Sequence, residues 1–154
     1  MRNLLIPGEY DCVARQSINR ARLSLAHQTS CTAAQAYFLI AVMHDKCFPN
    51  SQAPIVKLRA PRVGKVGARG WGGIKQGRAY VSLPETPYDP RIHSQPFGRL
   101  RIGLVCHEYA HAVEMLRFGK SDHGPRFTMI LDGLLFDTEQ YWLPKSSQIA
   151  AETK

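Results

Sequence analysis

Apolar residues recur along this chain at two different spacings, which separate predicted helices from predicted strands. A repeat of three to four residues is typical of a helix with one buried face. It predicts four helices, over residues 8–27, 32–47, 100–118 and 125–142. In the second of these, Thr32 and Gln35 have the spacing of a capping box, and residues 38–43 are apolar on every side, so we expect deep burial.

A looser alternation of apolar and polar residues follows the second helix and predicts short strands. The predicted strands cover residues 55–59, 62–66 and 78–83. We expect them to form a small antiparallel sheet whose glycine-rich turns surround Trp71. The whole pattern predicts an α+β fold with two N-terminal helices, about three strands, and two further helices.

Length and composition limit the architecture. The chain has 154 residues, of which 44% are apolar, and we expect one domain over residues 1–144 with a flexible tail over residues 145–154. It has no run of about 18 apolar residues, so we expect no membrane span, and its first residues turn polar too early for a signal peptide. The four cysteines form no C-x-x-C pair, which argues against a separate zinc ribbon. These cysteines favour a reducing compartment, so we expect the protein in the cytoplasm. If the chain is viral, this would be the cytoplasm of the host cell. Association with the nucleoid is a further option.

The net charge of +8 arises from one segment. Residues 46–84 contain eight basic residues and no acidic one, whereas basic and acidic residues balance elsewhere. This is the footprint of a phosphate-binding surface, although general solubility is an alternative explanation. Trp71 and Tyr80 could stack on single-stranded bases, or pack in the core or a turn. The candidate DNA- or substrate-binding residues are Lys57, Arg59, Arg62, Lys65, Arg69, Trp71, Lys75, Arg78 and Tyr80.

The third predicted helix carries the motif H-E-x-x-H. His107 and His111 are four residues apart and therefore share one helix face, where both could bind a metal ion. His123 follows a predicted helix stop at Gly119 and supplies a third ligand. Three protein ligands with an open fourth position suit a catalytic Zn²⁺, and Glu108 is the candidate general base. The alternatives are a chance motif or a buried helix whose histidines bond to backbone.

Several nearby residues have less certain roles. The candidates for stabilising an oxyanion are Tyr80, His93 and Arg126. Glu114 lies on nearly the same face as His107, where it is either a partner that orients a histidine or, more simply, a solvated glutamate. Asp122 beside His123 has the same two interpretations. His44, near a helix end, is best explained as a surface or capping group.

H-E-x-x-H followed by His123, Gly124, Pro125 and Phe127 resembles the SprT-like (Spartan-type) zinc metallopeptidases. The resemblance covers residues 32–135 and includes the order of elements and a glycine–tryptophan–glycine segment. It implies a zincin-like fold and one Zn²⁺ held by His107, His111 and His123, with Glu108 as general base. It further implies cleavage of proteins trapped on DNA, an activity that depends on DNA, preferably with single-stranded character. Family members carry a zinc ribbon or partner-binding tails, and we expect neither in this chain.

In zinc peptidases of this kind the strand beside the metal helix offers its free edge to an extended substrate, and residues 78–83 are the candidate. Two other functions stay open. One is a nucleic-acid-binding protein with a structural or inactive metal site, which an intact Glu108 argues against. The other is a repressor-cleaving metallopeptidase, which the segment after His123 fits less well.

Overall fold

The computed structural model describes residues 30–59, 70–85 and 100–145. The helix predicted over residues 8–27, the strand predicted over residues 62–66 and nearly all of the predicted tail lie outside these ranges. Within them the fold is mixed α+β, as the sequence predicts. None of the described helices is both long enough and apolar enough to cross a membrane.

Several ends of the described helices lie where local chemistry predicts them. The described helices are α2 (Ala33–Cys47), α3 (Ile102–Phe118) and α4 (Pro125–Asp137), the last continued by a π-helical turn over Thr138–Trp142. The capping box is present, because Gln35 N donates to Thr32 Oγ1 at 3.1 Å and Thr32 N donates to Gln35 Oε1 at 2.9 Å. Gly119 ends α3 in the left-handed conformation, with φ of 80°.

The main sheet differs from the predicted one. Its strands are β2 (Ile55–Arg59), β3 (Trp71–Lys75) and β4 (Arg78–Pro84), in the order β2-β4-β3. Gln76 and Gly77 both have positive φ and form the tight turn between β3 and β4, which pair antiparallel. β2 pairs with the other edge of β4 in parallel, so the expected all-antiparallel sheet is wrong. A separate short pair joins β1 (Ser30–Cys31) to β5 (Leu100–Arg101).

Two further corrections concern the strand beside the motif H-E-x-x-H. Residues 78–83 lie in β4, which is the central strand, so they cannot offer a free edge. The glycine-rich segment at Trp71 is itself a strand, β3, and it forms the edge of the described sheet on the side of α3. Glycine disfavours strands in general, but Gly72 is required here because a β-carbon would stand 1.7 Å from the carbonyl oxygen of Glu108.

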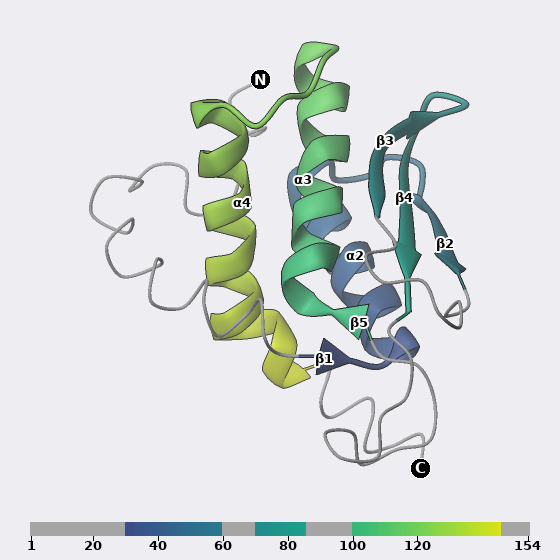
Figure 1. Cartoon of the computed structure of the whole chain (residues 1–154), viewed down its shortest axis with the longest axis vertical. Coiled ribbons are helices and arrows are strands. Elements are labelled where there is room, and N and C mark those ends of the chain that lie inside the picture. Colours follow the sequence, from purple (N-terminus) through teal and green to yellow (C-terminus); the bar gives the residue numbers. More distant parts are fainter. Residues whose placement is uncertain (1–29, 60–69, 86–99, 146–154) are drawn as a thin grey trace, which may run out of the picture.

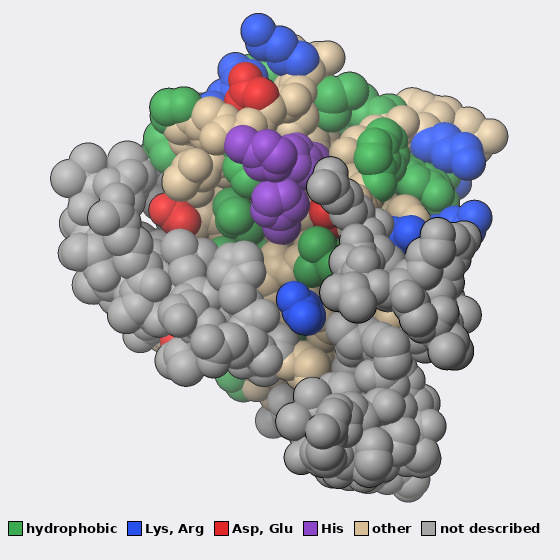
Figure 2. Space-filling view, viewed as in Figure 1, with side chains coloured by type: hydrophobic (Ala, Val, Ile, Leu, Met, Phe, Trp, Pro, Cys, Tyr) green, Lys and Arg blue, Asp and Glu red, His purple; other side chains and the backbone are tan. Residues whose placement is uncertain are grey.

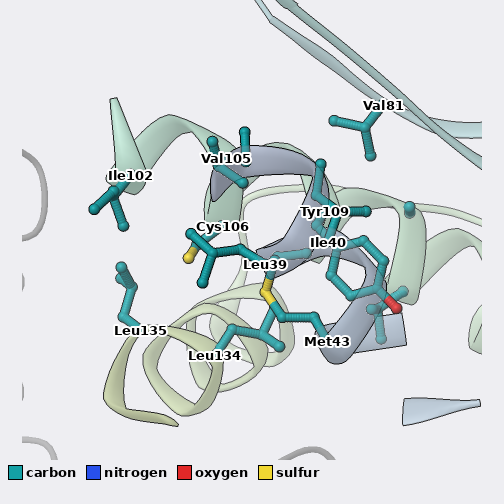
Figure 3. Packing of buried hydrophobic residues seen from close by; sticks show 14 of the residues in the cluster. Leu39, Ile40, Met43, Val81, Ile102, Val105, Cys106, Tyr109, Leu134 and Leu135 are labelled. Carbon is teal, nitrogen blue, oxygen red and sulfur yellow. The ribbon is translucent and has the colours of Figure 1, made fainter. Parts of the chain in front are cut away.

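Helix α3 is the central element of the fold. The sheet packs on one side of it, α4 packs on another, and α2 crosses behind (Figure 1). Side chains from α2, α3, α4 and β4 meet in one buried cluster that includes Leu39, Met43, Val81, Tyr109 and Leu134 (Figure 3). The motif H-E-x-x-H therefore lies on the helix that, among the described ones, packs against both the sheet and the other helices.

His44 is buried, with 5% of its surface exposed, so its interpretation as a surface or capping group is wrong. Its Nε2 lies 2.9 Å from the Gln52 carbonyl oxygen and 2.8 Å from Ser51 Oγ, and its Nδ1 lies 3.0 Å from the Tyr109 hydroxyl. A carbonyl only accepts, so Nε2 carries the proton and Nδ1 accepts from Tyr109. His44 thus joins α2 to α3.

Candidate metal centre

The three predicted histidine ligands converge. His107 and His111 lie one turn apart on α3, and His123 lies on the connection between α3 and α4. Nε2 of His123 is 3.1 Å from Nε2 of His111 and 3.3 Å from Nε2 of His107, and one nitrogen from each ring lies within 4.8 Å of the others. Nitrogens about 2.0–2.1 Å from one tetrahedral zinc stand about 3.3 Å apart. The cluster could therefore hold a metal ion of this size.

The cluster reaches the surface of the molecule. Histidine side chains gather on the face shown in Figure 2, and the ring of His123 is exposed whereas those of His107 and His111 are half-buried. Burial lowers the pKa of His111, and the neighbouring His123 contributes to the same effect. A lowered pKa favours the neutral imidazole that a metal ion requires.

Phe127 supports all three rings from beneath. Its ring centroid lies 4.9 Å from that of His107, 4.4 Å from that of His111 and 5.1 Å from that of His123. Phe127 projects from the first turn of α4 and is 3% exposed. This contact gives the phenylalanine of the His123–Phe127 segment a physical role, which is to limit the orientations of the ligand rings.

Glu108 lies beside the cluster and is 7% exposed. Burial raises its pKa to about 6, while the positive charge of Arg59 acts in the opposite direction. A β-carbon at Gly70 would lie 2.7 Å from Cγ and 2.8 Å from Oε2 of Glu108, so the absence of a side chain at Gly70 makes room for the carboxyl group. A carboxyl group with this pKa can exchange a proton near neutral pH.

Glu108 and the three histidines line one cleft of about 760 Å³. Gly70, Trp71, Gly72 and Gly73 form one wall, and Leu104 and Met115 of α3 supply apolar surface. The edge strand β3 therefore lies along the cleft that contains the candidate metal ligands. This arrangement leaves room for an extended chain beside the carboxyl group.

Glu114 is fully buried, so its interpretation as a solvated glutamate is wrong. Its Oε1 accepts hydrogen bonds from Ser121 Oγ at 2.8 Å and from Asp122 N at 3.1 Å. Its Oε2 pairs with Arg126 Nε at 2.9 Å. Ser121 Oγ is in turn 2.6 Å from His111 Nδ1. Glu114 is therefore connected to a ligand ring through one hydroxyl group.

The candidate residues Arg126, Asp122 and Tyr80 each contact a residue other than the three histidines. Arg126 pairs with Glu114 and stacks 3.7 Å above the Phe118 ring, which argues against an oxyanion role. Asp122 Oδ1 accepts from Gly124 N at 2.9 Å and so closes the turn before α4. Tyr80 contacts Trp71 on the sheet, and His93 lies outside the described residues.

The predicted DNA-binding residues are only partly described, because Arg62, Lys65 and Arg69 lie outside the described ranges. The strand register places the described ones on one face of the sheet: Lys57, Arg59, Trp71, Lys75, Arg78 and Tyr80. Arg59 acts electrostatically on Glu108 at one end of the sheet. Arg78 Nε donates to the Ala53 carbonyl at 2.9 Å.

Trp71 and Tyr80 form an aromatic pair on the sheet face opposite the helices. Their ring centroids are 5.3 Å apart, and Trp71 is 50% exposed. The Lys75 ammonium group lies 5.1 Å from the centroid of the Tyr80 ring. The register places Lys57 beside Ser82 on the same face, because paired residues of neighbouring strands point the same way. The exposed Trp71 and the partly buried Tyr80 thus have basic neighbours.

No family model, curated protein or solved structure matches this chain. The functional assignment therefore depends on the residues and their geometry. Two residues of the site, Ser121 and Phe127, were not identified from the sequence as parts of it. The seven-residue spacing from His107 to Glu114 was the available signal for the buried network, but no spacing rule identifies Ser121 as its intermediate.

Proposed function

We propose that this protein is a zinc-dependent endopeptidase of the SprT-like, zincin-like type, which cleaves DNA-bound or DNA-crosslinked proteins. The observation that carries the proposal is the convergence of His107, His111 and His123 with Glu108 in one cleft. Three neutral nitrogen ligands with a carboxyl group beside them are the donor set of catalytic rather than structural zinc sites.

The residues of the cleft divide the chemistry between them. The ion, when bound, supplies Lewis-acid activation of water and of the scissile carbonyl. The three histidines hold it, and Phe127 restricts their rings. Glu108 accepts a proton from the attacking water and passes it to the leaving amine nitrogen, for which a pKa of about 6 is well suited.

The shape of the cleft favours a polypeptide substrate. β3 borders the cleft, and no strand within the described residues pairs with its outer edge. An extended peptide can pair with such an edge through main-chain hydrogen bonds. Gly70 has no side chain that could cover the carboxyl group of Glu108, so the substrate backbone can approach this carboxyl group closely.

The proposed link to DNA has two supports. The excess positive charge of the chain falls within residues 46–84, and the sequence resembles the SprT-like family. The exposed Trp71 and its partly buried neighbour Tyr80, with Lys75 and Lys57 on the same sheet face, offer stacking surface and charge for single-stranded DNA. This surface adjoins the cleft because Trp71 contributes to both.

The test compares proteolysis of a DNA-binding protein with and without single-stranded DNA. Wild type, Glu108→Gln and the control Glu85→Gln, which changes a glutamate outside the cleft, are assayed together with their zinc content. We expect cleavage that needs zinc and is stimulated by DNA, retained in Glu85→Gln and lost in Glu108→Gln at unchanged zinc content.

Two results would contradict the proposal in different ways. Full zinc occupancy with no cleavage under either condition would favour a nucleic-acid-binding protein with an inactive metal site. Cleavage that is indifferent to DNA would favour the repressor-cleaving alternative, since that activity does not require a DNA surface.

A further inference from the structure

The most enclosed charged side chain among the described residues is that of Glu114, with no exposed surface. Burying a carboxylate is costly unless its oxygens are paired and hydrogen-bonded. Here Arg126 supplies the opposite charge, and Ser121 and Asp122 supply two hydrogen bonds. Glu114 lies on α3 about two helical turns beyond His107 and about one turn beyond His111, so this pairing adjoins the histidine cluster.

Counting protons fixes the state of His111. Ser121 has one hydroxyl proton and donates it to Oε1 of Glu114. Its oxygen, 2.6 Å from Nδ1 of His111, must therefore accept the proton carried by Nδ1. In the neutral ring this leaves the lone pair on Nε2, the nitrogen that faces His123 at 3.1 Å. The carboxylate thus selects, through the hydroxyl group, the tautomer that a metal ion needs.

The same carboxylate also anchors the segment that carries the third ligand. Oε1 accepts from the backbone N–H of Asp122, which immediately precedes His123. Oε2 pairs with Arg126 on the first turn of α4. Glu114 on α3 therefore contacts the connection and the following helix at once, and these contacts limit the distance between His123 and the two ligands on α3.

We infer that Glu114 is a positioning residue of the metal centre, which orients His111 through Ser121 and fixes the segment of His123 before any ion binds. This inference rests on the proposed metal site but not on the proposed peptide hydrolysis. Partners of this kind typically change metal affinity by about 10–100-fold when removed. A purely structural carboxylate would change stability without changing affinity in the folded protein.

The test measures zinc affinity of the full chain by competition with a chromophoric chelator, together with the visible spectrum of the Co²⁺-loaded protein. Glu114→Ala leaves Arg126 without its charge partner and is expected to unfold in part, so the primary variant is Ser121→Ala. Ser121→Thr keeps a hydroxyl group. Thr128→Val is the matched control, because it removes a hydroxyl that bonds the Gly124 carbonyl in the first turn of α4 and does not reach His111.

We expect Ser121→Ala to weaken zinc binding about 10–100-fold and to alter the Co²⁺ spectrum, while the metal-free protein keeps its circular dichroism. Ser121→Thr should recover most of the affinity, and Thr128→Val should bind as wild type does. Wild-type affinity in Ser121→Ala, or an equal loss in Thr128→Val, would overturn the inference and leave the proposed peptidase intact. Absence of zinc binding by wild type would overturn both.

Discussion

The backbone of Gly72 in β3 lies directly against the backbone of Glu108 in α3. A β-carbon at position 72 would stand 1.7 Å from the Glu108 carbonyl oxygen and 2.6 Å from its carbonyl carbon. Because both partners are backbone atoms of regular elements, neither can rotate away. The edge strand β3 and helix α3 can therefore pack this closely only because Gly72 has no side chain.

Gly72→Ala should consequently separate β3 from α3 or prevent folding. We expect a loss of about 3 kcal/mol or more in the free energy of unfolding, because the clash involves rigid backbone in a packed interface. Urea denaturation of the metal-free protein measures this loss, and Ile74→Val in the same strand is the control, with an expected cost of about 1 kcal/mol. A loss below about 1 kcal/mol in Gly72→Ala would show that the interface is looser than the geometry indicates.

Gly70→Ala, unlike Gly72→Ala, should reduce peptide hydrolysis without a large loss of stability. Its β-carbon would meet Cγ and Oε2 of Glu108, which belong to a side chain that can rotate. We expect a stable protein with normal zinc content but a displaced carboxyl group. Peptide hydrolysis should fall about tenfold or more, since general acid–base catalysis contributes about 10²–10⁴-fold. Stability, zinc content and hydrolysis are measured on one preparation, and undiminished hydrolysis would contradict the assigned role of Glu108.

These two glycines illustrate what the sequence predicts and what it does not. Helix bounds followed from local chemistry: the Thr32–Gln35 capping box, the stop at Gly119 and proline at the start of α4. Strand β3 was not predicted, because glycine disfavours a strand and Gly72 is explained only by its contact with α3. That contact joins residues far apart in the sequence, and no periodicity encodes it.

The candidate site, too, was predicted only in part from the sequence. His107 and His111 share a helix face by spacing alone, and His123 was identified from the helix stop that precedes it. The buried network behind them depends on the path of the chain from Gly119 to Pro125. This path brings Ser121 and Arg126 to Glu114, and a residue count along the helix cannot show that the side chain is buried.

Trp71 allows a test of the proposed DNA surface. It is half exposed and lies 5.3 Å from Tyr80, so stacking of a base on it needs no rearrangement of the sheet. We expect Trp71→Ala to weaken binding of single-stranded DNA by about 1–3 kcal/mol, and Trp71→Phe to weaken it less. Fluorescence anisotropy with a labelled oligonucleotide measures the affinity. Tyr141→Ala removes a similarly exposed aromatic residue at the end of the C-terminal helix and should have no effect; an equal loss there would exclude a specific surface.

His44 predicts a pH dependence of stability that is independent of the metal ligands. Burial lowers its pKa below the ordinary value of 6.5, against smaller opposing effects of the Gln52 carbonyl and Asp45. The unfolded chain therefore binds a proton at a higher pH than the folded chain does. The stabilisation from neutral His44 is complete above about pH 6.5 and is lost as the pH falls through the lower pKa of the folded state.

Urea denaturation of the metal-free protein at a series of pH values below neutrality measures this effect. In the window between the two pKa values, the free energy of unfolding should fall by up to about 1.4 kcal/mol per pH unit from this group. His44→Gln cannot titrate, so it should be less stable at neutral pH but show a shallower decline with acid. The two slopes separate His44 from the other titrating groups. An equal decline in both proteins would mean that protonated His44 is tolerated between Tyr109 and the Gln52 carbonyl.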